Sequence, residues 1–275
     1  MGKKDNNVWA YFFWYVFYFA LFWLILGANM RSFWIVLIFY AISISFAFSR
    51  LAEELWRNVT GVRPLRLRKE KIRLLPLFEE VYADVIKADK HLSKEIKLYI
   101  KEDMDINAFA FGKETLVLTR GSIELLNDEC LKGLIAHEFG HFSNYDTTTS
   151  LLMSVGNFYF SVLIAILERI KNFVDRKKKG SIVLILFKAL LDCVYWIFRG
   201  IQFLSDFSLT VTRREQEYSA DEFAVKSGFG EELAEVLNEI YSTSFSEPQS
   251  IKEQLKSTHP PITIRIERVE NAVYS

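Results

Sequence analysis

The feature that most restricts the fold of this chain is a long apolar stretch near its start. Between Trp9 and Ser49 the only charged side chain is Arg31. A short polar segment, residues 27–32, divides the stretch into two runs. Each run is long enough, or nearly so, to cross ~30 Å of hydrocarbon as an α-helix. A soluble core helix normally keeps a polar stripe. We therefore expect a transmembrane hairpin within residues 1–50 rather than a buried soluble hairpin.

A cleaved signal peptide is the other interpretation of the same stretch. Lys3 and Lys4 followed by an apolar run have the order of charged and apolar regions that such a peptide shows. The possible cleavage site near Ala28 is weak, and a second apolar run follows at once. The sequence therefore favours a hairpin that stays in the lipid bilayer.

The distribution of lysine and arginine predicts the orientation of this hairpin. Lys3 and Lys4 precede it and a basic stretch follows from Arg50 to Arg73, whereas Arg31 alone lies in the connecting loop. Basic residues are enriched in cytoplasmic segments, so both ends of the hairpin should face the cytoplasm. The chain is thus expected to be a multi-pass integral membrane protein with its soluble part on the cytoplasmic side. We expect the membrane to be a bacterial or archaeal cell membrane.

A second apolar pair follows at 151–167 and 182–204. It is less regular, because the later segment carries a polar stripe in which Lys188 and Asp192 are spaced to pair with each other. The loop between the two segments is basic, which opposes the usual orientation if the pair spans the bilayer. Spanning and a tilted position on the inner membrane face both remain open, and we favour spanning.

The remaining sequence predicts an α+β soluble part. Helical periodicity covers residues 74–90, and alternation predicts a strand at 95–101. Two more strands are expected at 107–111 and 115–119 with a turn at Gly112 and Lys113, and a helix should begin near Asp128. Lysine plus arginine and aspartate plus glutamate both number 34, which argues against a dedicated nucleic-acid binder. Two cysteines exclude a disulfide-stapled secreted fold. The oligomeric state is not determined by these features.

The segment His137-Glu138-Phe139-Gly140-His141 carries the chemistry of this chain. Imidazoles at positions i and i+4 lie on one helical face, within reach of one Zn²⁺. Glu138 is then placed to act as a base toward a water that the metal has made acidic. The motif lies in an apolar helical context, which favours zinc over surface or core histidines.

A catalytic zinc needs a third protein ligand and an open position. The acidic segment 212–223 offers Glu215, Glu217 and Glu222. Glu217 and Asp221 are also spaced i, i+4, so that one can bind the metal while the other holds a ligand histidine. A solvated acidic face is the alternative, and periodicity alone does not choose between the carboxylates.

Four blocks resemble the HtpX and CAAX prenyl endoprotease family of membrane zinc metallopeptidases. They are the zinc-motif helix, the strand segment 107–112 (NAFAFG), the acidic segment 214–221 (REQEYSAD) and the C-terminal segment 257–266 (STHPPITIRI). Their order and spacing agree with the family, including the apolar pair between the second histidine and the acidic segment. The short chain is more similar to the HtpX type than to the larger prenyl proteases.

The resemblance implies a fold and a set of roles. The fold would be an α+β zincin-like (gluzincin) metalloprotease domain with transmembrane helices, mostly α with one small sheet. One Zn²⁺ per chain would be held by His137, His141 and Glu217, with Glu138 as general base. Asp221, Arg214 and Arg265 are expected around the metal. His259 is the candidate oxyanion donor, and the alternative is that it caps the chain before the Pro-Pro turn. The expected substrate-binding strand consists of Asn107, Ala108, Phe109 and Ala110.

These expectations give the chain four parts. A transmembrane hairpin covers 1–50, the first part of the protease domain with the zinc-motif helix covers 51–148, a second apolar hairpin covers 149–206, and the rest of the protease domain covers 207–275. The expected function is that of a zinc endopeptidase that cuts membrane or membrane-proximal proteins at the cytoplasmic face. By analogy with the family, we expect a role in membrane-protein quality control. A prenyl-peptide endoprotease and a non-catalytic membrane partner with a structural zinc are the alternatives.

Overall fold

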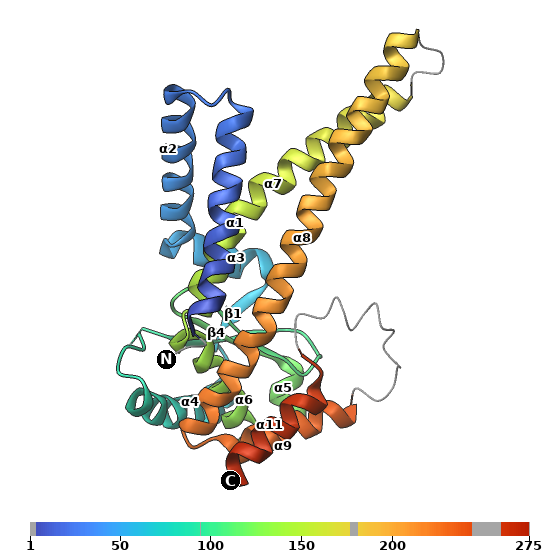
Figure 1. Ribbon diagram of the computed structural model, residues 1–275. Coiled ribbons are helices and arrows are strands. Elements are labelled where there is room, and N and C mark those ends of the chain that lie inside the picture. The colour runs from blue at the N-terminus through green and yellow to red at the C-terminus, as the bar shows by residue number, and fades with distance from the viewer. Residues whose placement is uncertain (1–3, 94, 177–180, 244–259, 275) are drawn as a thin grey trace. The chain divides into compact units, whose positions relative to one another are not determined.

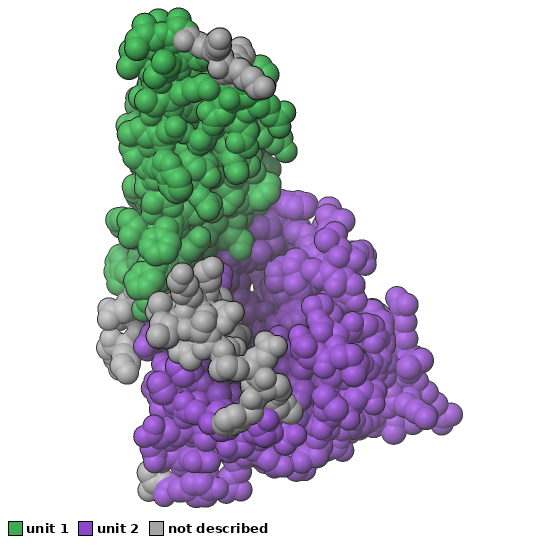
Figure 2. Space-filling view, turned by 90° about the vertical axis from the view of Figure 1, so that its right-hand side faces the viewer, with its two compact units in different colours: residues 1–44, 152–212 green, residues 45–151, 213–275 purple. Residues whose placement is uncertain are grey.

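The computed structural model describes residues 4–93, 95–176, 181–243 and 260–274, and it divides into two compact units (Figure 2). The first unit comprises Met1–Ile44 and Leu152–Thr212, and the second comprises Ser45–Leu151 and Arg213–Ser275. Each unit is thus assembled from two separate stretches of the chain. The two stretches of the second unit carry the zinc motif and the acidic segment.

The first unit is built from helices (Figure 1). They are α1 (Lys4–Ile25), most of α2 (Met30–Ala47), and the larger parts of α7 (Asp146–Asp175) and α8 (Ile182–Lys226). Helices α2 and α7 are long and apolar enough to cross a membrane, and α1 contains a shorter apolar segment, Trp9–Ile25. Only 17 % of the apolar window of α2 and 28 % of that of α7 are buried, unlike the core helix of a soluble protein.

The helix α8 is longer than the apolar run that predicts it. It continues without a break from Ile182 to Lys226, because no proline or glycine pair follows Leu204 to end it. The polar residues of its first turns pair across to α7 rather than along α8. Lys188 lies 3.7 Å from Asp175, and Asp192 lies 2.8 Å from Lys171. The expected Lys188–Asp192 pair is therefore replaced by bridges between neighbouring helices.

The second unit contains a four-stranded mixed sheet in the order β1-β2-β4-β3. The strands are β1 (Val62–Pro64), β2 (Lys97–Lys101), β3 (Ala108–Phe111) and β4 (Thr115–Thr119). Strand β2 runs antiparallel to β1 and parallel to β4, and β3 pairs antiparallel with β4. Three strands lie where the sequence predicts them, whereas β1 was not expected because its three residues are too few to show a period. The sheet order leaves β3 at an edge.

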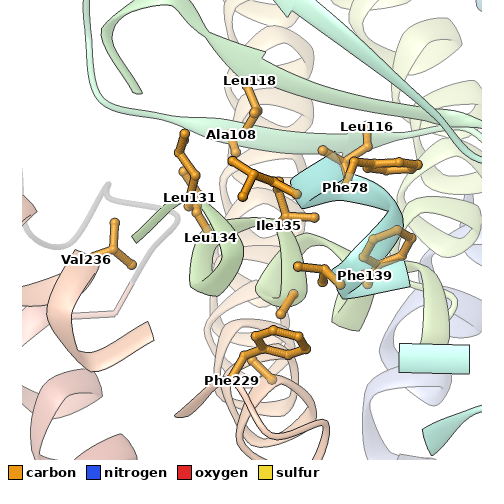
Figure 3. Packing of buried hydrophobic residues seen from close by; sticks show 14 of the residues in the cluster. Phe78, Ala108, Leu116, Leu118, Leu131, Leu134, Ile135, Phe139, Phe229 and Val236 are labelled. Atoms are coloured by element: carbon orange, nitrogen blue, oxygen red, sulfur yellow. The ribbon is translucent and has the colours of Figure 1, made fainter. Parts of the chain in front are cut away.

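Helices of the second unit pack on this sheet and on one another. They are α3 (Arg50–Thr60), α4 (Arg68–Ala88), α5 (Arg120–Leu125), α6 (Asp128–Ser143), α9 (Gly230–Thr243) and α11 (Ile262–Tyr274). The core is centred on α6, where Leu131, Ile135 and Phe139 are fully buried (Figure 3). Helix α6 begins where the sequence predicts, because the Asn127 side chain accepts a hydrogen bond from the backbone N–H of Cys130. The fold is mostly helical with one small sheet.

A buried ion-pair network ties β1 to the start of α4 and to α5. Glu70, with a side chain only 4 % exposed, is bound by Arg63 at 2.7 Å and by Arg120 at 2.9 Å. Both arginines also reach Glu102, at 2.5 and 2.9 Å. The arginines hold the pKa of Glu70 well below its usual range, and they lower that of Glu102 to about 2.

The network predicts how stability depends on pH. A carboxylate whose pKa is depressed by folding stabilises the protein above its unfolded pKa of about 4.3 and loses that contribution as pH falls. We expect the melting temperature to drop between about pH 5 and pH 2, and Glu70→Gln to flatten this drop and to cost roughly 3 kcal/mol at pH 7. Thermal unfolding in detergent at several pH values measures both effects. An unchanged pH profile in Glu70→Gln would contradict the assignment.

Candidate metal centre

Helix α6 holds the three residues of the zinc motif inside the protein. His137 and Glu138 are each 4 % exposed. Ligand atoms of His137, Glu138 and His141 all lie within 4.8 Å of one another. One helical turn separates the two histidines, which explains why their rings meet on one face. The structure thus brings the predicted motif together as a buried cluster.

Helix α8 supplies the carboxylate that faces this cluster. Glu217 Oε2 lies 3.6 Å from Nε2 of His137, and Glu217 Oε1 lies 3.6 Å from Nε2 of His141. The approach of α8 depends on Gly140, because a Cβ at this position would lie 2.7 Å from the Cα of Ala220. Among the candidate carboxylates of the acidic segment, Glu217 is the one directed at both histidines, whereas Glu215 and Glu222 are exposed.

The other ring nitrogen of each histidine is held by a carboxylate. Asp221 Oδ1 lies 2.9 Å from Nδ1 of His137, as the i, i+4 spacing with Glu217 allows. Asp146 Oδ2 lies 3.0 Å from Nδ1 of His141. Such carboxylates fix the tautomer and the ring orientation, so that each Nε2 would present its lone pair to a metal ion bound beside Glu217.

Asp146 is a site residue that the sequence did not indicate. It follows His141 by five residues, a spacing that no helical period connects. The chain turns between α6 and α7 at Tyr145, whose φ of 61° is left-handed, and this turn places the first residue of α7 against the ring of His141. An acidic residue directly after the end of the motif helix was the only available signal.

Arg265 on α11 joins the acidic residues of the site. It binds Asp221 with two hydrogen bonds, Nε at 2.9 Å and Nη2 at 2.7 Å, and its Nη1 lies 3.1 Å from Glu217 Oε2. The residue is 8 % exposed. A planar guanidinium suits such a two-pronged contact. Arg265 thus lies beside Glu217 and Asp221, and its role at a metal site stays a prediction.

The pKa shifts follow from burial and from these contacts. Burial lowers the pKa of His137, but the carboxylates of Asp221 and Glu217 outweigh burial and raise it to about 10. Burial raises the pKa of Asp221, and Arg265 and His137 more than offset this and keep it below its usual value. The carboxylates thus favour positive charge at the histidine cluster, which a proton or a metal ion can supply.

The residues fit a zinc ion. Two ligands at 2.0–2.1 Å from a tetrahedral Zn²⁺ lie roughly 3.3 Å apart, close to the two 3.6 Å separations between the histidine nitrogens and Glu217. Two imidazoles and one carboxylate are a donor set that zinc accepts. Within the described part of the chain, the buried Oε2 of Glu138 has no hydrogen-bond partner, as expected of a group directed at a site that holds a ligand.

The other expected site residues are placed less directly. Arg214 is half-buried on α8, one turn before Glu217. Asn107 is exposed, and its Oδ1 accepts from the backbone N–H of Ala108, at the point where edge strand β3 begins. Strand β3, with Phe109 and Ala110, packs against α6. His259 lies outside the described residues.

The contact between Asp146 and His141 predicts an effect on metal affinity. Asp146→Asn removes the charge that orients and polarises the imidazole, so zinc should be bound about 10- to 100-fold more weakly. Competition with a chromophoric chelator measures this affinity. Asp128→Asn is the matched control, because Asp128 also lies in a first helical turn but is paired with Arg73 at 2.8 Å. Equal zinc affinity in the two variants would contradict the proposed role.

Fold and site together place an HExxH motif on a helix beside a small mixed sheet, where it faces a carboxylate from a second helix and could hold a metal ion. The chain belongs to peptidase family M48, whose family model matches residues 77–273. A protein named Protease HtpX homolog from Tropheryma whipplei (strain Twist) is 30 % identical over 63 % of this chain and 65 % of its own length.

A second relative and one solved structure are also similar to this chain. A Protease HtpX homolog from Bacteroides fragilis (strain YCH46) is 31 % identical over 60 % of this chain and 50 % of its own length. The chain therefore spans about half to two thirds of the relatives that it matches. The crystal structure of S. mikatae Ste24p superposes with a TM-score of 0.56 at 14 % identity, covering 93 % of this chain and 61 % of that one. This last likeness concerns the fold alone.

Proposed function

We propose that this protein is a membrane-integrated zinc endopeptidase with a zincin-like catalytic domain. The observation that carries the proposal is the convergence of His137 and His141 on the two oxygens of Glu217, each at 3.6 Å. Membership of peptidase family M48 supports the reaction. The apolar helices α2 and α7 support the membrane location, and the lysine and arginine distribution supports a cytoplasmic catalytic side.

The side chains would divide the chemistry as follows. One Zn²⁺ held by His137, His141 and Glu217 would supply Lewis acidity toward a peptide carbonyl and a water. Glu138 would take a proton from the attacking water and deliver it to the leaving amine, as a buried carboxylate at the reacting centre can do. Asp221 and Asp146 keep the two imidazoles oriented, and Arg265 balances the charge of the buried carboxylates.

The substrate would be an extended peptide. Strand β3 has one partner, β4, in the described sheet, and it packs against the helix that carries the zinc motif. A peptide that adds to the free edge of β3 would make main-chain hydrogen bonds there and pass close to Glu138. Asn107, Ala108, Phe109 and Ala110 would thereby bind substrates with little dependence on side-chain sequence, as protein quality control requires.

Removal of the third ligand tests the proposal. Glu217→Ala leaves two protein ligands, so purified protein should lose its stoichiometric zinc and its cleavage of casein in detergent. Elemental analysis and a fluorescent casein assay measure the two losses. Glu222→Ala is the control, because Glu222 lies on the same helix but is exposed and pairs with Arg268 at 3.4 Å. Full zinc content and activity in Glu217→Ala would refute the metal site.

A further inference from the structure

One face of helix α3 binds the turn between β3 and β4. Glu53 Oε1 accepts hydrogen bonds from the backbone N–H groups of Lys113 and Glu114, at 2.5 and 3.3 Å. The ring of Trp56 stacks on Phe111 with centroids 3.8 Å apart. The turn residue Gly112 has a φ of 62°, and a Cβ there would collide with Glu53. The end of the edge strand is therefore fixed directly to α3.

The outward face of α3 is apolar and uncovered within the described structure. Leu51, Leu55 and Val59 follow one another at i, i+4 and i+8, and they are 57 %, 47 % and 86 % exposed. At 100° per residue the centre of this stripe lies about 160° from Glu53 and about 100° from Trp56, so the stripe faces away from the side chain that binds the turn. Three aliphatic side chains in one stripe are more than the scattered exposed apolar residues of an ordinary surface. Something apolar is expected to cover this stripe.

The bilayer interface is the occupant that the chain itself indicates. Helix α2, apolar and long enough to span, ends at Ala47, and the N-cap Ser49 starts α3 two residues later. A short helix so close in sequence to a span cannot lie far from the membrane surface. The exposed Lys113, whose Nζ lies 5.3 Å from the ring centroid of Phe48, places a cation at the start of α3, which suits anionic headgroups, whereas the charge of Arg50 is paired with Glu95 and Glu114. Amphipathic helices with this pattern lie in the plane of the interface.

We propose that α3 is an interfacial helix whose Leu51–Leu55–Val59 stripe lies in the headgroup layer of an anionic bilayer, and that it thereby holds the edge strand β3 beside the membrane. This rests on the proposed function and specifies its substrates. The four residues of β3 extend only ~13 Å from the turn that α3 holds. Peptides that bind there are extended segments close to a membrane surface, such as the loops and tails that flank transmembrane helices.

A fluorescence quenching experiment tests the position of α3. The full chain carries Cys193→Ser, and an NBD label is attached at Leu55→Cys, Phe39→Cys or Glu231→Cys. Cys130 stays unlabelled, because burial raises the pKa of its thiol to about 12. Each protein is reconstituted into vesicles of phosphatidylcholine and phosphatidylglycerol. Lipids with a doxyl group near the headgroup probe the interface, and iodide probes water.

The expected result is that doxyl lipid quenches the label at position 55 at least about twofold more than the label at position 231, as for an interfacial helix. Quenching at position 55 by iodide alone would show a solvated stripe and overturn the proposal. Protection from both quenchers would show a protein cover, such as a second copy of this chain, and would overturn it equally. Position 39 on α2 reports membrane insertion by itself, so failure of the membrane model is recognised separately from failure of the α3 inference.

A cleavage experiment tests the consequence for substrates. Leu55→Asp is compared with Leu125→Asp, a matched change at another leucine, 58 % exposed on α5. Leu55→Asp should lower cleavage of an acyl-anchored casein peptide about fivefold and leave cleavage of the same free peptide unchanged, because only the anchored peptide depends on α3 at the interface. Leu125→Asp should change neither. Unchanged cleavage of the anchored peptide, or equal loss on both peptides, would overturn the proposal, whereas absence of all cleavage by the parent protein would refute the proteolytic function instead.

Discussion

Glu138→Gln is expected to abolish peptide-bond hydrolysis and to leave the bound zinc in place. Glutamine has nearly the same shape but cannot take a proton from water at neutral pH. Loss of such a general base costs about 10²- to 10⁴-fold in rate. The three proposed ligands, His137, His141 and Glu217, are untouched, so the zinc content should remain near one ion per chain. Casein cleavage and elemental analysis on the same preparation measure the two quantities.

The control for this variant lies on the same helix. Glu129 is in the first turn of α6 with a side chain 56 % exposed, and Glu129→Gln should keep both zinc and activity. Residual cleavage above a few per cent in Glu138→Gln would contradict the assigned role. Loss of zinc together with activity would instead indicate that Glu138 is itself a metal ligand, as a structural zinc site with four protein ligands requires.

Arg265→Ala is expected to destabilise the second unit strongly. The guanidinium is buried between Asp221 and Glu217, and its removal leaves two buried carboxylates without their cation. Breaking a buried pair in this way costs roughly 3–5 kcal/mol. The melting temperature should therefore fall well below that of the parent protein. The fall should be larger in EDTA than in excess zinc, because the metal supplies positive charge beside the same carboxylates and its binding stabilises the folded state.

Arg268→Ala provides the comparison. Arg268 lies three residues further on α11, its side chain is 40 % exposed, and it pairs with Glu222 at 3.4 Å. Exposed pairs contribute about 0–1 kcal/mol, so this variant should melt close to the parent. Differential scanning fluorimetry in detergent, with and without zinc, distinguishes the two. Equal melting temperatures for the two arginine variants would show that the buried network does not hold the site together.

The sequence predicted those elements whose signals are local. The residues of β2 alternate between polar and apolar, those of β4 are β-branched or apolar, and Asn127 marks the start of α6. These three elements therefore begin within two residues of the expected positions. Strand β1 was not predicted, because its three residues are a strand only by pairing with β2. The length of α8 was also not predicted, since its first half is apolar and its second half is polar and acidic although one helix contains both.

The sequence by itself determined the apolar segments, the histidine pair of the motif and the need for a carboxylate partner, because these depend on composition and on the helical repeat. The tertiary structure decided which carboxylate serves His141 and which faces both rings. Asp146 and Glu217 reach their places through a left-handed turn at Tyr145 and a close approach of α8 at Gly140. Contacts between distant segments arise from packing, and packing has no period that can be read along a chain.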